Sequence, residues 1–219
     1  MDIGFLFDWD GVVIDSHRHH EESWEVLAEE IGHPLPEGFM KTTFGMRNES
    51  IFPLWLPHLL GDKPAMTALA DRKEDLYREL LHSDGIEALP GVKDFLKAAR
   101  AAGIPACVGT STPRKNVDVV IELAGLQGLF DAIVSADDVR HGKPDPEVFL
   151  KGAQKLGRQP ERCVVFEDAF VGIEAGKSGG MKVVGIATTH PIEKLTQADI
   201  ALHDLTGVNP LELVKRLGL

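Results

Sequence analysis

The sequence is poor in cysteine and lacks a long hydrophobic run. Its 219 residues include two cysteines, Cys107 and Cys163, each inside a short apolar stretch. Such thiols are typical of small buried hydrophobic residues rather than of a disulfide framework, so we expect a reduced, cytoplasmic protein. No apolar run approaches the roughly 20 residues that span a bilayer. The amino-terminal residues also lack the basic segment of a signal peptide, so we expect neither a membrane protein nor an exported one.

Positive charge is also scarce. The chain has 23 Lys and Arg residues against 34 Asp and Glu residues, a formal net charge of −11. Nucleic-acid-binding domains usually carry an excess of basic residues, so we expect no nucleic-acid partner. The lack of a long apolar run likewise leads us to expect no membrane partner. A small anionic ligand remains compatible with this charge, because local cations or a bound metal ion outweigh the global field. The length fits one domain, or a core domain that carries a smaller one.

Short apolar runs, bounded by turn signals, recur along the chain. They are apolar throughout rather than alternating, which is typical of strands covered on both faces of a parallel sheet. Between them lie segments with apolar residues at helical spacing, for example Val92, Phe95, Leu96 and Ala99. This alternation predicts an α/β fold with a Rossmann-like, doubly wound parallel sheet. The predicted strands cover residues 3–7, 105–109, 132–135, 163–166 and 183–186.

One interval, from about residue 16 to residue 83, breaks the alternation. It contains no convincing strand, while helical stripes such as Trp24, Leu27 and Ala28 are frequent. Pro53 and Pro57 interrupt its middle, which predicts several short helices rather than one long helix. We therefore predict a helical cap over residues 16–83, inserted after the first strand. The catalytic core would then consist of residues 1–15 and 84–219.

Polar residues follow four of the predicted strands at the point where each strand ends. In an open parallel sheet the ligand binds outside the carboxyl ends of the strands, so we expect these side chains to meet at one edge. Four acids, a hydroxyl cluster and a lysine are a set suited to a phosphoryl group and a divalent metal ion. The segments are Asp8-Trp9-Asp10, Thr110-Ser111-Thr112, Gly142-Lys143-Pro144 and Glu167-Asp168.

The spacing of Asp8 and Asp10 is itself informative. Residues i and i+2 of an extended stretch point to the same side, so both carboxylates could face one bound group. One could attack as a nucleophile while the other moves protons. Glu167 and Asp168 would supply further oxygen atoms for Mg²⁺, which prefers such ligands. The ammonium group of Lys143 could offset the charge of these carboxylates and of a phosphate.

Four segments, taken in order, resemble the four motifs of the haloacid dehalogenase superfamily. They are FDWDGVVIDS, VGTSTPRKN, GKPDPEVF and VVFEDAFVGIEAG. The helical insert after the first motif is similar to the small cap of the sugar-phosphate phosphatase and β-phosphoglucomutase branch. The resemblance covers the whole chain, and four ordered motifs are far more specific than one DxD pair.

The resemblance implies a role for each matching position. Asp8 would be the nucleophile that forms an aspartyl-phosphate, and Asp10 would be the general acid and base. Thr110 and Lys143 would bind the transferring phosphoryl group. The implied cofactor is Mg²⁺, with Asp8, the carbonyl group of Asp10 and Asp168 as ligands and Glu167 as a further ligand or as a neighbour that holds them. The presence of Asp10 disfavours the dehalogenase branch, which needs no such proton donor.

Each core residue also has an ordinary structural interpretation. Asp8 and Asp10 could solvate a turn at Gly11, and Lys143 could be a surface lysine. Asp168 could simply favour the positive end of the helix that follows it. Thr112-Pro113 is typical of a helix start, which leaves Thr110 available for binding. The convergence of four strand ends favours the functional interpretation.

Cap residues complete the candidate substrate site, together with Ser111 of the core. Ser16 and His20 share a helix face with Trp24, and His20 is either a packed or exposed histidine or a binding residue. The resemblance places a hydroxyl group and a histidine at these positions and an arginine in the segment Gly45-Met46-Arg47. Lys73 stands in an apolar stripe, so it either extends to water or points into the cleft toward a second anionic group of the substrate.

Taken together, these features predict a Mg²⁺-dependent phosphatase that acts on a small phosphorylated metabolite, with a sugar phosphate as the expected class. The alternative within enzymes is a β-phosphoglucomutase-type phosphomutase, which uses the same aspartyl-phosphate but returns the phosphoryl group to the substrate. A third hypothesis is a non-catalytic protein that binds phosphorylated metabolites. The sequence does not predict the oligomeric state or the individual substrate.

Overall fold

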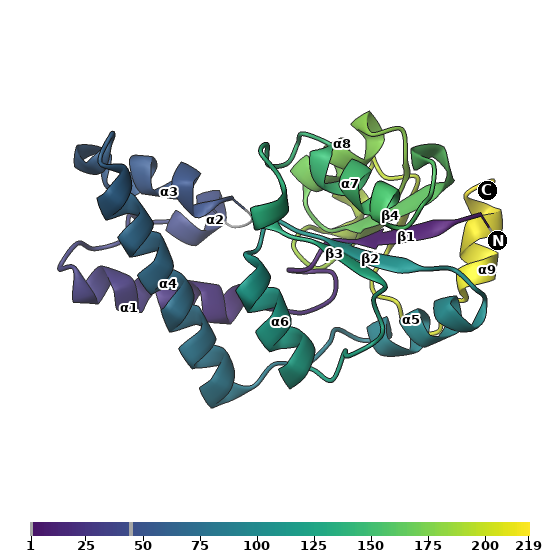
Figure 1. Ribbon diagram of the computed structural model, residues 1–219, viewed down its shortest axis with the longest axis horizontal. Helices are drawn as coiled ribbons and strands as arrows, with labels where there is room; N and C mark the ends of the chain where they lie inside the picture. The colour runs from purple at the N-terminus through teal and green to yellow at the C-terminus, as the bar shows by residue number, and fades with distance from the viewer. Residues whose placement is uncertain (1, 44–45) are drawn as a thin grey trace.

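A six-stranded parallel sheet flanked by helices forms the larger part of the protein, and a layer of further helices lies to one side of it (Figure 1). The structure is a computed structural model, and it describes residues 2–43 and 46–219. The strands lie in the order β3-β2-β1-β4-β5-β6, which confirms the predicted α/β fold with a parallel sheet. The strands are β1 (Gly4–Phe7), β2 (Ala106–Gly109), β3 (Ala132–Val134), β4 (Cys163–Glu167), β5 (Lys182–Ile186) and β6 (Ile200–Leu202). The sequence pattern does not predict β6, because its three half-buried residues are too short a run.

Helices cover both faces of the sheet, which explains why its strands are apolar along most of their length instead of alternating between apolar and polar residues. Phe5 and Phe7 of β1 belong to the hydrophobic cluster on one face, whereas Leu6 between them belongs to the cluster on the other. The first face packs against α5 (Val92–Ala101), α6 (Arg114–Leu123) and α9 (Pro210–Arg216), and the second against α7 (Glu147–Lys155) and α8 (Phe170–Ser178). Short 3₁₀ turns lie at η1 (Pro57–Leu59), η2 (Ala136–Asp138), η3 (Pro160–Arg162) and η4 (Ile192–Lys194).

Four helices between β1 and α5 form a layer beyond the carboxyl ends of the strands (Figure 1). They are α1 (His17–Glu30), α2 (Phe39–Thr43), α3 (Asn48–Trp55) and α4 (Lys63–Asp84). Their shared core is aromatic, with Trp24 edge-on to Phe52 and Trp55. We retain the division into a cap of residues 16–83 and a core of residues 1–15 and 84–219 as a proposal.

The two prolines of this layer differ in their effect on its helices. Pro57 begins η1, after the end of α3. Pro53, by contrast, lies inside α3 and does not interrupt it as we expected. A proline near the end of so short a helix removes only one main-chain hydrogen bond, so the helix tolerates it. Among the described residues, no helix is both long enough and apolar enough to cross a membrane.

The aromatic cluster under the sheet offers a test of the fold. The Phe95 ring of α5 is 1% exposed and stacks on Phe5 at a centroid distance of 5.5 Å. We expect Phe95→Ala to lower the free energy of unfolding by about 3–5 kcal/mol, because it leaves a cavity between helix and sheet. Leu54→Ala is the control, since Leu54 is 67% exposed and its loss should have little effect. Equal stability of the two variants in urea unfolding would contradict this account of the core.

Candidate active site

Three buried carboxylates meet at the carboxyl ends of β1 and β4. Asp8 follows the last residue of β1, Glu167 is the last residue of β4, and Asp168 comes directly after it. Each offers an oxygen atom within 4.8 Å of the others. The parallel pairing of Phe7 with Phe166 places the two strand ends side by side. The structure therefore brings together the acids that the sequence analysis expected at this edge.

Lys143 lies between two of these acids. Its Nζ atom is 2.6 Å from Oδ1 of Asp8 and 2.6 Å from Oε1 of Glu167. Burial alone would lower the pKa of the Lys143 ammonium group, but the two carboxylates raise it above the ordinary value. Lys143 is therefore positively charged, and its ammonium group lies against the carboxylate of Asp8, the predicted nucleophile.

Glu167 already has protein donors on both of its oxygen atoms. Oε1 accepts from Lys143 at 2.6 Å, while Oε2 accepts from the main-chain N–H groups of Asp168 and Ala169 at 2.8 and 2.9 Å. A Cβ atom at Gly172 would lie 1.6 Å from Oε1, so only glycine leaves room for this carboxylate. The arrangement favours a Glu167 that holds Lys143 and Asp168 in place over one that ligates a metal ion directly.

Asp168 is held from the loop after β5. The hydroxyl group of Thr189 donates to its Oδ2 atom, and that of Thr188 lies 3.4 Å from the same atom. Gly11, with a φ angle of 81°, passes so close that a Cβ atom would lie 2.1 Å from Oδ2. Neither threonine is among the site residues predicted from the sequence. In open parallel sheets the ligand binds at the carboxyl ends of the strands. Thr188 and Thr189 follow β5, so the same rule applied to this strand predicts them as site residues.

The charges at this edge are unbalanced. Among the residues that the structure describes, three buried acids face one lysine here. Burial together with repulsion from Glu167 raises the pKa of Asp8 well above its ordinary value. Burial and Glu167 likewise raise the pKa of Asp168 to about 7. A divalent cation between Asp8 and Asp168 would relieve this repulsion, and carboxylate oxygen atoms are the ligands that Mg²⁺ prefers. The residues present therefore fit the predicted metal ion.

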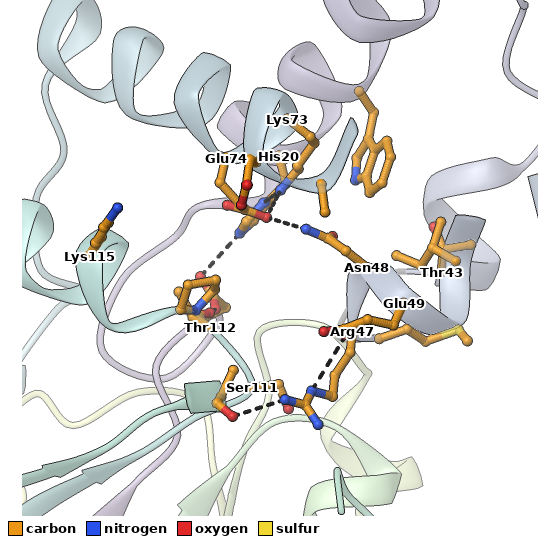
Figure 2. A pocket seen from close by; sticks show the side chains of 18 of the residues that line it. His20, Thr43, Arg47, Asn48, Glu49, Lys73, Glu74, Ser111, Thr112 and Lys115 are labelled. Atoms are coloured by element: carbon orange, nitrogen blue, oxygen red, sulfur yellow. Dashed lines mark hydrogen bonds and ion pairs between the residues drawn. The ribbon is translucent and has the colours of Figure 1, made fainter. Parts of the chain in front are cut away.

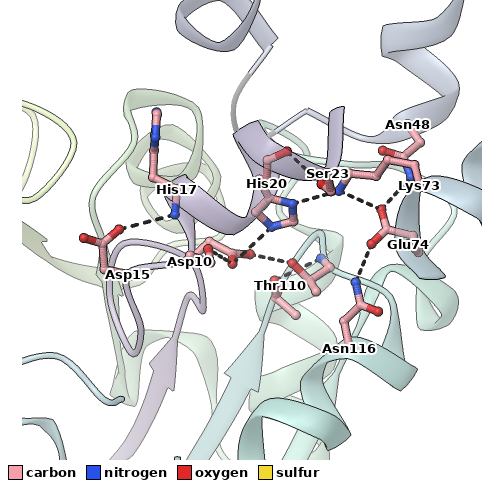
Figure 3. Close-up of polar contacts among 12 residues, drawn as sticks. Asp10, Asp15, His17, His20, Ser23, Asn48, Lys73, Glu74, Thr110 and Asn116 are labelled. Carbon is pink, nitrogen blue, oxygen red and sulfur yellow. Dashed lines mark hydrogen bonds and ion pairs between the residues drawn. The ribbon is translucent and has the colours of Figure 1, made fainter. Parts of the chain in front are cut away.

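Asp10 has a different environment from Asp8, although only one residue separates them. The hydroxyl groups of Ser16 and Thr112 donate to its two oxygen atoms, and Nε2 of His20 lies 3.6 Å from Oδ1 (Figure 3). Burial would raise the pKa of Asp10, but these three groups lower it to about 2. In this arrangement Asp10 is therefore ionised.

The hydroxyl cluster after β2 differs in detail from the expected helix start. Thr112-Pro113 predicts a helix start with Thr112 as its cap, yet α6 begins at Arg114 and the Thr112 hydroxyl group donates to Asp10 instead. Thr110 is buried, and its own hydroxyl group accepts the main-chain N–H of Thr112 at 3.0 Å. The sequence alone does not distinguish a Thr112 that caps a helix from a Thr112 that donates to Asp10, because a threonine before a proline suits both.

A pocket of about 530 Å³ lies between the four-helix layer and the sheet edge. Of the predicted substrate-binding residues, His20, Arg47, Lys73 and Ser111 line it together with Asp10. Ser16 lies beside the pocket and binds Asp10. Arg47 reaches across to the core, where it donates to the carbonyl oxygen of Ala136 at 2.9 Å (Figure 2). Of the segment expected around it, Gly45 lies outside the described residues.

Lys73 does not extend to water. Its side chain is 2% exposed, and Nζ lies 3.1 Å from Oε1 of Glu74 and 2.7 Å from Nδ1 of His20. A lysine can only donate in such a contact, so the ring proton of a neutral His20 faces Asp10 on Nε2. His20 also stacks on Tyr77 at a centroid distance of 4.2 Å. Thus the suspected interruption of the apolar stripe is a buried ion pair.

Comparison with known proteins assigns the chain to a family. The model of the haloacid dehalogenase-like hydrolases matches residues 4–180. The chain belongs to the haloacid dehalogenase-like hydrolase family. This finding confirms the predicted family and the predicted enzyme class.

Relatives of this hydrolase include several phosphatases. Hexitol phosphatase A of Escherichia coli is 33% identical over 205 residues, which are 94% of this chain and 92% of that protein. Validoxylamine A 7'-phosphate phosphatase of Streptomyces hygroscopicus is 31% identical and is covered to 94%. A chloroplastic 5-amino-6-(5-phospho-D-ribitylamino)uracil phosphatase of Arabidopsis thaliana is 33% identical, but this chain spans only 57% of its length.

Solved structures agree with the fold of the hydrolase. A β-phosphoglucomutase from Clostridium difficile has a TM-score of 0.86 and 25% identity, with 100% of this chain and 98% of that chain covered. A family IA hydrolase from Entamoeba histolytica has a TM-score of 0.87 and 30% identity, with 99% and 100% covered. The comparison thus includes both of the enzyme classes that the sequence left as alternatives.

The contact between Thr189 and Asp168 can be tested by metal binding alone. We expect Thr189→Val to weaken the affinity for Mg²⁺ by about 10- to 100-fold, because the carboxylate loses the donor that orients it. Thr189→Ser keeps the hydroxyl group and should retain most of the affinity. Calorimetric titration of each variant with Mg²⁺ measures the effect, and unchanged affinity in Thr189→Val would show that the threonine does not orient the ligand.

Proposed function

We propose that this hydrolase is a Mg²⁺-dependent phosphatase that cleaves small phosphorylated metabolites, sugar phosphates above all, through an aspartyl-phosphate on Asp8. The observation that carries the proposal is the position of Asp8, with Lys143 2.6 Å away and Asp168 beside it. An anionic nucleophile needs positive charge around it before it can approach a phosphate that is itself negative, and Lys143 would supply this charge together with a metal ion held by Asp8 and Asp168. The relatives named as phosphatases support the same reaction.

In the first half-reaction, a carboxylate oxygen of Asp8 forms a bond to phosphorus while the bond from phosphorus to the leaving oxygen breaks. Lys143 and the hydroxyl group of Thr110 would stabilise the charge on the transferring phosphoryl oxygen atoms. Asp8, the main-chain carbonyl of Asp10 and Asp168 would hold Mg²⁺, which supplies further positive charge to these oxygen atoms when bound. Glu167 would keep Lys143 and Asp168 in position.

In the second half-reaction, Asp10 takes a proton from water as the water attacks phosphorus, and Asp8 is released. Asp10 is ionised in this structure, so its carboxylate is free to accept this proton. The proton that it gains is the one required by the leaving alcohol of the next substrate molecule. Ser16, Thr112 and His20 would hold the carboxylate in place for both steps.

The phosphomutase remains the second candidate, because the β-phosphoglucomutase fold is so similar. A mutase must hold a second phosphate of a bisphosphate in the pocket while the first is transferred. Of the basic residues expected there, Lys73 is already paired with Glu74, and Arg47 already donates to Ala136. This pairing favours the hydrolase. Arg47, Lys73, His20, Ser16 and Ser111 remain the proposed residues around the substrate.

We also retain a reduced, cytoplasmic location as a proposal. Cys107 and Cys163 are free and buried. Burial raises the pKa of the Cys107 thiol to about 12 and that of the Cys163 thiol to about 11, so neither is activated for disulfide exchange.

The nucleophile provides a direct test of the proposed phosphatase. We expect Asp8→Asn to abolish turnover of p-nitrophenyl phosphate while the circular dichroism spectrum stays unchanged, because an amide has a similar volume but does not attack phosphorus. Chelation with EDTA should stop the wild-type enzyme, and added Mg²⁺ should restore it. Near wild-type activity in a folded Asp8→Asn variant would exclude the aspartyl-phosphate. A wild-type enzyme without any turnover would support the non-catalytic binding protein.

Phosphorus NMR separates the hydrolase from the mutase. With β-glucose 1-phosphate, Mg²⁺ and a trace of glucose 1,6-bisphosphate, we expect free phosphate as the main product. Water then reaches the aspartyl-phosphate before a second hydroxyl group does. Rapid conversion to glucose 6-phosphate with little free phosphate would instead establish the mutase.

A further inference from the structure

The buried lysine of the pocket is neutralised by its neighbour in the chain. Glu74 is 8% exposed, and its carboxylate accepts from three elements at once. Lys73 of α4 donates to Oε1 at 3.1 Å, Asn48 of α3 donates to the same atom at 2.7 Å, and Asn116 of α6 donates to Oε2 (Figure 3). Separating this pair would leave a buried charge without a partner, which is strongly unfavourable. Lys73 is therefore not available to a second anion.

The other cations of the pocket are also engaged or screened. Arg78 donates to Oδ1 of Asn116 at 2.5 Å and to Asp75. Arg47 donates to the carbonyl oxygen of Ala136 and lies 3.8 Å from Glu49 (Figure 2). Lys115 has no ion pair or hydrogen bond with another described residue, but it is exposed to solvent, where water and salt screen its charge.

Carboxylates outnumber cations around the same pocket. Among the described residues that line it, six are Asp or Glu and four are Lys or Arg. A second phosphate or a carboxylate on the substrate would enter a negative environment, which selects against such ligands. Hydroxyl groups, by contrast, can donate to these carboxylates and accept from Asn48.

We propose that the pocket accepts phosphate monoesters whose alcohol part bears hydroxyl groups and no second negative charge, and that Glu74 sets this limit by neutralising Lys73. The proposal rests on the phosphatase activity proposed above. It narrows the substrate class from phosphorylated metabolites in general to neutral polyol and sugar monophosphates. It also gives Glu74 a role in choosing between neutral and charged substrates, which the sequence pattern did not indicate.

A matched pair of substrates tests the proposal. Glucitol 6-phosphate and 6-phosphogluconate are both open six-carbon chains, and they differ only in a hydroxymethyl or a carboxylate group at the end remote from the phosphate. For the wild-type enzyme we expect kcat/KM for glucitol 6-phosphate to exceed that for 6-phosphogluconate by about tenfold or more. A ratio near one, or a preference for 6-phosphogluconate, would overturn the proposal.

Substitutions of Glu74 then test its role. Glu74→Gln removes one negative charge and leaves Lys73 without its carboxylate partner, so it should raise kcat/KM for 6-phosphogluconate. The ratio of kcat/KM for glucitol 6-phosphate to that for 6-phosphogluconate should therefore fall by about tenfold. Glu74→Asp keeps the charge and should preserve the ratio. The control is Glu79→Gln, which removes the same charge from the exposed face of α4, where Glu79 binds Arg72. Equal ratios in Glu74→Gln and Glu79→Gln would overturn the assignment.

A second variant protects the test against misfolding. If thermal melting shows that Glu74→Gln does not fold, Asp71→Asn removes an exposed carboxylate from the same pocket. In Asp71→Asn the ratio of the two kcat/KM values should fall by about threefold, which is less than in Glu74→Gln because solvent screens the charge of Asp71. An unchanged ratio would contradict the proposal. Turnover of p-nitrophenyl phosphate separates the two levels of inference. A wild-type enzyme that does not hydrolyse p-nitrophenyl phosphate would refute the proposed function. A wild-type enzyme that hydrolyses it but does not prefer glucitol 6-phosphate over 6-phosphogluconate would refute only the present proposal.

Discussion

The concentration of negative charge at the ends of β1 and β4 is the constraint on which the site depends. Asp8, Glu167 and Asp168 repel one another, so the surrounding structure must hold them together. The parallel register of Phe7 with Phe166, whose rings stack at 4.4 Å, fixes the two strand ends. Lys143 bridges two of the carboxylates, and glycine stands at each place where a Cβ atom would collide with one of them. The apolar sheet thus serves as the rigid support of a polar site.

Asp10 connects this support to the helical layer. One of its oxygen atoms accepts from Thr112, in the loop that leads into α6, and the other lies near His20 of α1. From His20 the contacts continue to the Lys73–Glu74 pair of α4 and return to α6 through Asn116 (Figure 3). The chain of contacts is closed, so the positions of α1 and α4 and the position of the Asp10 carboxylate depend on each other.

How much of this was predictable depends on how local each signal is. The parallel sheet and Asp8, Asp10 and Lys143 follow from runs and motifs of a few residues, and the structure brings the core residues together as expected. The pairing of Glu74 with Asn116 and of Thr189 with Asp168 joins residues 42 and 21 positions apart, and no periodicity reports such contacts. Lys73 is an intermediate case. Its misplaced charge was visible in the apolar stripe, but the partner that neutralises it was not.

The buried pair of Lys73 and Glu74 is therefore informative about function rather than about stability. Removing two charges from water is costly, and a well-packed apolar pair of similar volume often stabilises a fold at least as well. The retained pair has consequences that an apolar pair would lack. It orients His20 toward Asp10, and it places a cation in the pocket whose charge is already satisfied. In the proposed function, the core would handle the phosphoryl group through fixed charges, and the helical layer would present hydrogen-bonding groups to the alcohol. The two parts of the substrate would then be recognised by different physical means.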